Sequence, residues 1–421
     1  MPHPVRGDAR VRTPLLSRVL SLLGLATLCL PRCAEQQTFL GVLGRSMGVD
    51  TETGLPITPA RADEHELGRV ALDVGSAVTL LELAGEAGDP RTVDLRILEE
   101  RSAASTDGDA TIVRMLFPAA DVRVAAQGSL RLGAGDGVPI DGVIGADLLS
   151  RFAISFDLAR GRVTFLDEVP GTSSTLAQTD LLAVFAYRIR GGGNTSGSSC
   201  GENIPATRIL LDACFEDLDA DGASRKADFT ATPSTAVAPI VVSRSSFARL
   251  RPSFTPAACN ETLHLPSGSV GGACRTTVSA AALVSDTDAS GVERGPCRSL
   301  ARTSAGAGAP REAAAIACGD ARAFGCEALA DLAAESESES ESESEAEAGT
   351  SPEVVVYVVP DEVFATLRIE VGAGAAALDA IVGTQFFALF RFWVDYPSSR
   401  VILDCRSEPR CAHRERLPPL Q

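Results

Sequence analysis

Residues Asp141–Leu166 read DGVIGADLLSRFAISFDLARGRVTFL, and residues Asp379–Asp404 read DAIVGTQFFALFRFWVDYPSSRVILD. The two segments align without a gap, at a constant offset of 379 − 141 = 238 positions. The identical positions are Asp141/Asp379, Gly145/Gly383, Phe152/Phe390, Asp157/Asp395, Arg162/Arg400 and Val163/Val401. Each copy reads as an apolar strand ending in Gly, a short helix, a strand, a tight turn and another strand. A shared unit in fixed register predicts a duplicated chain with two related halves.

The rest of the chain divides around these two copies. We predict a first lobe over residues 38–170, a Gly/Ser-rich linker over residues 171–201 and a second lobe over residues 202–411. The short apolar runs between Gly and Asp turns indicate all-β lobes. The second lobe contains an insertion at about residues 285–351, in which ESESESESESEAE holds seven Glu. Because like charges repel and resist burial, we expect this insertion to be solvated and disordered.

Composition excludes several classes of protein. The 421 residues include 38 basic and 55 acidic side chains, for a net charge of −17, which excludes nucleic-acid binding through a general basic surface. Hydrophobic residues make up 45% of the chain, so wholesale disorder is excluded as well. No segment has the roughly 20 uninterrupted apolar residues that a membrane span needs. We find no nucleotide-binding glycine motif and no zinc-like cysteine spacing, and we predict neither a cofactor nor a metal.

The N-terminus reads as an export signal over residues 1–33. Three Arg among the first twelve residues precede the almost wholly apolar run Val19–Leu30. A Leu stands three residues before Cys33, as in bacterial lipoprotein signals, but Arg32 departs from the small residue of that pattern, so lipidation of Cys33 stays open. Nine of the eleven cysteines follow residue 199, where an oxidising compartment would let most of them pair. We expect a protein of the bacterial cell envelope, in the periplasm or on the outer membrane, or a secreted one.

One short segment of the first lobe carries candidate catalytic chemistry. Residues Val70–Leu81 read VALDVGSAVTLL, in which an Asp ends an apolar strand and is followed by x-Gly-Ser and a second apolar strand. Gly75 permits a tight turn and the close approach of another backbone. Ser76 can hydrogen-bond the carboxylate. We therefore predict that Asp73 is held rigidly at the mouth of a β domain.

The segment Asp73–Ser76 resembles the Asp-Thr-Gly-Ser signature of pepsin-like and retropepsin-like aspartic peptidases. Val143–Gly145 resembles the apolar-apolar-Gly segment that passes beside the catalytic loop in this family, and Ile381–Gly383 repeats it. The resemblance implies a mainly β, two-lobed, pepsin-like double β-barrel. It also implies a peptide or protein as substrate or ligand and, with both lobes in one chain, a monomer. The supporting residues that it implies are Gly75, Ser76, Gly145 and Gly383.

The chemistry of the family needs a second carboxylate facing Asp73, because one acid activates a water while the other donates a proton to the peptide carbonyl. Two alignments compete for its position. Ser234–Leu250 resembles the equivalent loop, strand and short helix, and this alignment puts Ser234 where the second Asp is expected. Alternatively, RILLD ending at Asp212 echoes RVALD ending at Asp73, which would make Asp212 the second acid. We favour the first alignment because its downstream strand and helix also fit.

Two functions follow from these alternatives. The chain is an exported aspartic endopeptidase, hydrolysing peptide bonds with a carboxylate-activated water, if a second-lobe acid faces Asp73. Otherwise it is a catalytically inactive pepsin-fold envelope protein that binds peptides or partners. The first lobe lacks the flap Tyr of pepsin-like enzymes, and Val74 replaces the usual Thr, so a hydroxyl is lost beside the carboxylates. These departures favour the inactive alternative, since a fold does not guarantee a function.

Overall fold

A computed structural model gives the structure of the chain. The residues that it describes are 39–99, 112–167, 181–185, 187–189, 208–218, 223–255, 259–284, 314–318, 354–365, 378–388, 390–397, 400–404 and 411–412. The predicted export signal and Cys33 lie outside these residues. No helix in the described ranges is both long and apolar enough to cross a membrane.

The first half of the chain forms a sheet that closes on itself, because β6 at one end of its strand order also pairs with β7, the second strand from the other end. In order across the sheet, the strands are β1 (Leu40–Gly41), β7 (Ile112–Ala125), β5 (Leu80–Glu82), β10 (Gly142–Ile144), β4 (His65–Leu72), β3 (Ile57–Ala62) and β6 (Pro90–Glu99). Alternation of apolar and polar side chains produces these strands. In β6, Val93, Leu95 and Ile97 are buried while Asp94 and Arg96 between them are more exposed.

The second half repeats the core of this arrangement. Its central strands are β15 (Arg208–Leu218), β16 (Ser224–Pro233), β17 (Ile240–Ser243), β22 (Val354–Val359) and β23 (Ala380–Val382). In the first half, β10 pairs in parallel with β4 and antiparallel with β5, while β5 and β7 are parallel. In the second half, β23 pairs in parallel with β16 and antiparallel with β17, while β17 and β22 are parallel. The same three pairings therefore form the centre of each lobe.

Further strands extend the sheet of the second lobe on both sides. They are β14 (Tyr187–Ile189), β18 (Glu261–Leu265), β19 (Gly268–Val278), β20 (Ala280–Val284), β21 (Ala314–Cys318), β26 (Cys411–Ala412) and, from the first half, β8 (Arg131–Ala134) and β9 (Val138–Pro139). A helix, α3 (Arg244–Leu250), follows β17 directly. A disulfide joins Cys259, two residues before the β18–β19 hairpin, to Cys274 in the second strand of that hairpin.

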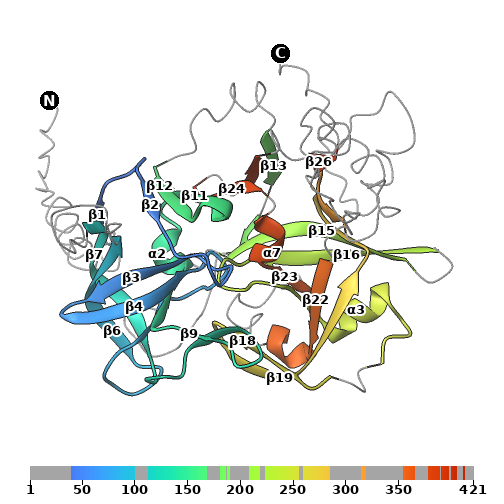
Figure 1. Cartoon of the computed structure of the whole chain (residues 1–421), viewed down its shortest axis with the longest axis horizontal. Helices are drawn as coiled ribbons and strands as arrows, with labels where there is room; N and C mark the ends of the chain where they lie inside the picture. Colours follow the sequence, from blue (N-terminus) through green and yellow to red (C-terminus); the bar gives the residue numbers. More distant parts are fainter. Residues whose placement is uncertain are drawn as a thin grey trace, which may run out of the picture.

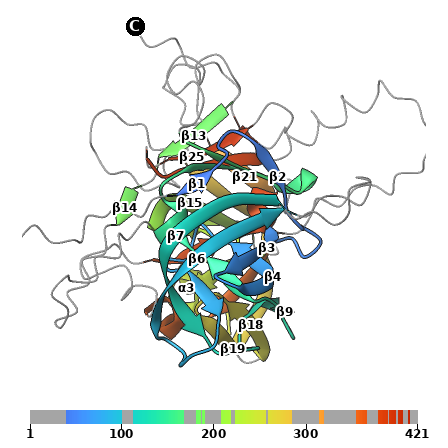
Figure 2. The ribbon, with the colours of Figure 1, turned by 90° about the vertical axis from the view of Figure 1, so that its left-hand side faces the viewer.

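A six-stranded sheet joins the two lobes. In order, its strands are β13 (Leu181–Phe185), β25 (Arg400–Asp404), β24 (Arg391–Asp395), β11 (Ala153–Asp157), β12 (Arg162–Leu166) and β2 (Ser46–Gly48). The antiparallel strands β11 and β24 place Ser155 opposite Trp393. Because 155 + 238 = 393, equivalent residues of the repeat face each other, and a pseudo-twofold axis passes between them. Figures 1 and 2 show this sheet at one end of both lobes.

The identical residues of the repeat have matching roles. The Asp141 carboxylate accepts the backbone N–H of Arg69 at 2.9 Å, and the Asp379 carboxylate accepts that of Thr230 at 3.0 Å. A Cβ on Gly145 would lie 2.5 Å from the carbonyl oxygen of Val78, so only Gly fits before the short helix α2 (Ala146–Leu149). Gly383 precedes α7 (Thr384–Phe387) in the same way. The fold is a pepsin-like double β-barrel.

Two predicted segments are only partly described. The linker predicted over 171–201 contains β13 and β14, and its remaining residues lie outside the described ranges. β13 pairs with β25 as β2 pairs with β12, so it completes the joining sheet symmetrically. The insertion predicted at about 285–351 contains β21, and the Glu/Ser tract lies outside the described residues.

The repeated glycine before α7 gives a test of the fold. A Cβ at Gly383 would lie 2.3–2.6 Å from the carbonyl oxygens of Pro239, Val237 and Ala238, so backbone must move to admit it. We expect Gly383→Ala to lower the free energy of unfolding by about 1–3 kcal/mol, measured by chemical denaturation. Gly271→Ala is the matched control because a Cβ there meets nothing within 4 Å. Equal stability of the two variants would contradict the packing described.

Candidate functional site

Asp73 and Ser234 occupy equivalent places in the two lobes. Asp73 follows β4, and its N–H donates to the carbonyl of Ile144 in β10 at 2.9 Å. Ser234 follows β16, and its N–H donates to the carbonyl of Val382 in β23, also at 2.9 Å. Both side chains are buried, with exposed fractions of 1% for Asp73 and 3% for Ser234. The structure therefore brings together Asp73 and Ser234, as the first of the two sequence alignments predicts.

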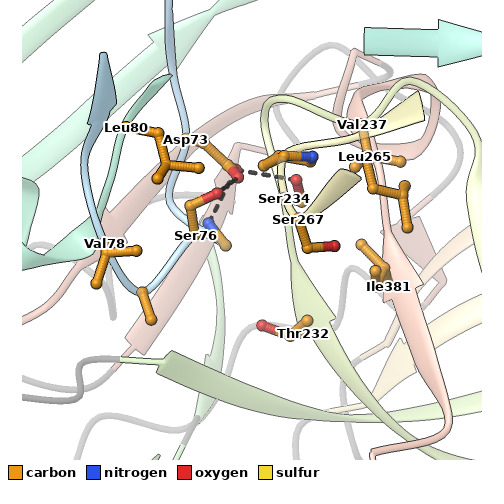
Figure 3. A pocket seen from close by; sticks show the side chains of 13 residues that line it. Asp73, Ser76, Val78, Leu80, Thr232, Ser234, Val237, Leu265, Ser267 and Ile381 are labelled. Atoms are coloured by element: carbon orange, nitrogen blue, oxygen red, sulfur yellow. Dashed lines mark hydrogen bonds between the residues drawn. The ribbon is translucent and has the colours of Figure 1, made fainter. Parts of the chain in front are cut away.

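The Asp73 carboxylate accepts hydrogen bonds from both lobes (Figure 3). Its Oδ2 accepts from the hydroxyl of Ser76 at 2.5 Å. Its Oδ1 accepts from the N–H of Gly75 at 2.9 Å, the hydroxyl of Ser234 at 2.9 Å, and the N–H groups of Thr235 at 2.9 Å and Ala236 at 3.2 Å. Three of these donors are backbone N–H groups, which cannot act as acceptors. The carboxylate is thus a buried acceptor that ties the second-lobe loop to the first lobe.

Thr235 adds a second link between the lobes. Its hydroxyl donates to the carbonyl of Leu72 at 2.5 Å and accepts the N–H of Val74 at 3.1 Å. Val74 stands at the equivalent first-lobe position and has no hydroxyl, so the reciprocal bond cannot form. Instead, the hydroxyl of the buried Tyr396 donates to the carbonyl of Val74 at 2.8 Å. Neither residue is a predicted site residue, although Thr235 follows Ser234 directly in the favoured alignment.

Gly75 and Ala236 show that the two loops are not interchangeable. A Cβ on Gly75 would lie 2.6 Å from the carbonyl oxygen of Pro233 and 2.8 Å from the Cβ of Ser234. The loops approach so closely here that the first-lobe position must be Gly. The methyl group of Ala236, at the equivalent second-lobe position, packs in a small buried apolar cluster with first-lobe residues such as Ile57.

A cavity of about 50 Å³ adjoins this pair of loops. Its walls come from both lobes, and its lining residues are Asp73, Gly75, Ser76, Ala77, Val78, Leu80, Thr232, Ser234, Val237, Leu265, Pro266, Ser267 and Ile381. Asp73 is the one acidic residue in this lining. The tip of the β18–β19 hairpin contributes Leu265–Ser267, so a second-lobe hairpin forms part of the cavity wall (Figure 3).

The β18–β19 hairpin also contacts the first lobe. β18 pairs with β8 through Leu263 opposite Ala134 and His264 opposite Gly133. The His264 imidazole lies 2.9 Å from the carbonyl oxygen of Gly135 by Nε2 and 2.7 Å from the Ser269 hydroxyl by Nδ1. The strand pairing and the contact between His264 and Gly135 connect the hairpin to the first lobe.

The other predicted site residues lie elsewhere. Asp212 lies inside β15, opposite Thr230 of β16, and does not line the cavity. Gly145 and Gly383 precede the two short helices beside the loops rather than lining the cavity. Within the described ranges, no group of three or more His, Cys, Asp or Glu side chains is placed to hold a metal ion.

A partly buried acid, Asp147, accepts hydrogen bonds from the end of the Asp73 loop. The Asp147 carboxylate of α2 accepts the N–H of Thr79 at 2.8 Å and its hydroxyl at 2.7 Å. The Thr79 hydroxyl in turn accepts the N–H of Gly145 at 3.0 Å. Burial raises the pKa of Asp147 to about 6, against the opposing effect of the Thr79 hydrogen bonds. These bonds fix the end of the loop that begins at Asp73.

Comparisons with known proteins show distant similarity in structure alone. No protein-family model matches the chain, and no curated protein matches its sequence. A soybean basic 7S globulin is similar with a TM-score of 0.38 and 11% identity, over 86% of this chain and 94% of that one. Conglutin gamma from lupine seeds has a TM-score of 0.34 and 11% identity, over 85% and 93%. An aspartic proteinase from Irpex lacteus has a TM-score of 0.32 and 12% identity, over 87% and 98%. Values this low do not define a function.

The raised pKa of Asp147 predicts a pH-dependent stability. A carboxyl whose pKa is about 6 when folded and 3.8 ordinarily binds its proton more tightly in the folded state. Its contribution is complete below pH 3.8 and is lost as the pH rises through 6. We expect the free energy of unfolding of the native protein to fall over this range by about 3 kcal/mol relative to Asp147→Asn. Denaturant titrations at several pH values measure this difference.

Asp136→Asn, in an exposed turn, is the control for the loss of one carboxyl group. Parallel stability curves for the native protein and Asp147→Asn would show that burial of this acid carries no pH dependence.

Proposed function

We propose that the chain is a non-hydrolytic protein of the pepsin-like fold that binds peptide segments of other proteins in the bacterial cell envelope. The observation that carries this proposal is the 2.9 Å hydrogen bond from the Ser234 hydroxyl to Asp73 Oδ1. A serine thus occupies the position from which a second acid would share a proton with Asp73.

The hydrogen bonds around Asp73 support a binding role over a catalytic one. Hydrolysis by an acid pair needs one carboxylate that accepts a proton from water and one carboxylic acid that donates to the carbonyl. Asp73 Oδ1 already accepts from three backbone N–H groups and the Ser234 hydroxyl, so this oxygen is engaged in holding the two loops together. A serine hydroxyl is too weak an acid to replace the missing carboxylic acid.

The cavity supports a peptide as the ligand. Its walls are apolar at Val78, Leu80 and Val237, and its polar groups gather around Asp73 and Ser234. A mostly apolar site with a few polar groups is the usual composition of a binding pocket. A volume of about 50 Å³ limits what enters to a small group at the end of a larger ligand.

The test is an assay of cleavage and binding on the same peptides. The full chain is incubated with a mixed peptide library between pH 3 and pH 7, and the products are analysed by mass spectrometry. We expect no cleavage in any sample, together with saturable binding of a subset of the peptides. Asp73→Asn and Asp212→Asn are the matched variants. Cleavage that disappears in Asp73→Asn would overturn the proposal, and cleavage that also needs Asp212 would restore the second alignment.

A further inference from the structure

One polar group in the lining of the cavity beside Asp73 has no hydrogen-bond partner among the described residues. Thr232, at the end of β16, lines the cavity and is 2% exposed. Its hydroxyl has no hydrogen-bond partner within the described part of the chain. A buried hydroxyl without a partner costs free energy, so its presence in the wall of a cavity points to an occupant (Figure 3).

The charge in the cavity is also uncompensated. Asp73 is buried, and no Lys, Arg or His of the described residues forms an ion pair with it. Its five hydrogen bonds come from neutral donors, so none of them brings a positive charge to the carboxylate. Buried charges are normally paired, so the cavity favours a cation over a neutral or anionic group.

The polar groups around the cavity can act as acceptors. Asp73 Oδ2 accepts only from the Ser76 hydroxyl among the described donors, and it keeps a lone pair. The Ser234 oxygen uses its hydrogen in the bond to Asp73 and keeps its lone pairs. The Thr232 oxygen has its full capacity. A primary ammonium group has three donors and no acceptor, which matches such a set.

We propose that this cavity binds a primary ammonium group, supplied by a lysine side chain or by the N-terminus of a peptide. This inference rests on the proposed function, because the peptide ligand carries the ammonium. The volume of about 50 Å³ suits an ammonium with one or two methylene groups, and the lining includes Leu80, Leu265 and Ile381, which would contact those methylene groups. A water molecule would satisfy Thr232 but leave the charge of Asp73 unpaired, so it is the competing occupant.

The first experiment uses n-butylammonium as the probe and n-butanol as its neutral counterpart. Binding to the full chain is measured by ligand-observed NMR titration. We expect saturable binding of n-butylammonium that exceeds that of n-butanol by about tenfold or more, because hydrogen bonds to charged groups are stronger than neutral ones.

Matched variants locate the binding. Asp73→Asn keeps an acceptor at Oδ1 and presents an amide N–H to Ser76, so it preserves the hydrogen bonds while removing the charge. Thr232→Val replaces the orphan hydroxyl with a methyl group of the same size. We expect each to weaken n-butylammonium binding by about tenfold or more. Thr230→Val, two residues earlier on β16 and outside the cavity lining, leaves it unchanged.

The second experiment identifies the source of the ammonium. Peptides that bind in the library assay are compared with free and acetylated N-termini, and with lysine replaced by norleucine. Loss of binding on acetylation assigns the N-terminus, and loss with norleucine assigns the lysine side chain.

Equal binding of n-butanol and n-butylammonium would overturn the ammonium site and leave water as the occupant. Undiminished n-butylammonium binding in Asp73→Asn or Thr232→Val would mean that the probe binds elsewhere and would overturn the site as well. Neither result would affect the non-hydrolytic proposal, which only peptide cleavage contradicts.

Discussion

One buried carboxylate holds the centre of this molecule together. Asp73 belongs to the first lobe, yet three of its five donors, from Ser234, Thr235 and Ala236, belong to the second. Because an unpaired buried carboxylate is costly, the two loops must stay in contact for the protein to keep its fold. The joining sheet supports the same arrangement from the other end of the lobes, where β11 pairs with β24. The contact between the two loops beside the cavity therefore has a structural role of its own.

Side chains break the pseudo-twofold symmetry of the backbone where the two loops at Asp73 and Ser234 meet. The pairs Asp73/Ser234, Val74/Thr235 and Gly75/Ala236 occupy equivalent positions and differ in charge, hydrogen bonding and size. Across this contact the second-lobe loop donates four hydrogen bonds to the first lobe and accepts one, from the N–H of Val74. A symmetric acid pair would need matching carboxylates, whereas this arrangement needs only one. The result is a small recess with one acidic residue, lined by both lobes and by the tip of the β18–β19 hairpin.

The architecture could be predicted from the sequence because the residues that the fold requires are identical in the two copies of the repeat. Asp141 and Asp379 accept backbone N–H groups, and the glycine at 145 has no room for a side chain, so these positions resist change. The alignment of Ser234 with Asp73 followed from the same pattern. The bond from Tyr396 to Val74 joins residues 322 positions apart, and no local pattern reports such a contact. The contact of the β18–β19 hairpin with the first lobe through His264 likewise depends on how the lobes pack, so it could not be predicted from the sequence.

Replacing Ser234 with a carboxylate measures the central contact directly. Ser234→Asp would set two carboxylates side by side, and such a pair must share a proton. Proton sharing raises the pKa of the pair, so Ser234→Asp should be as stable as Ser234→Asn near pH 3.5. Towards pH 8 it should become progressively less stable than Ser234→Asn, by about 1.4 kcal/mol for each unit by which the pKa is raised. Denaturation curves of the two variants across this range should therefore diverge. Curves that stay parallel would mean that the residue at 234 does not face Asp73.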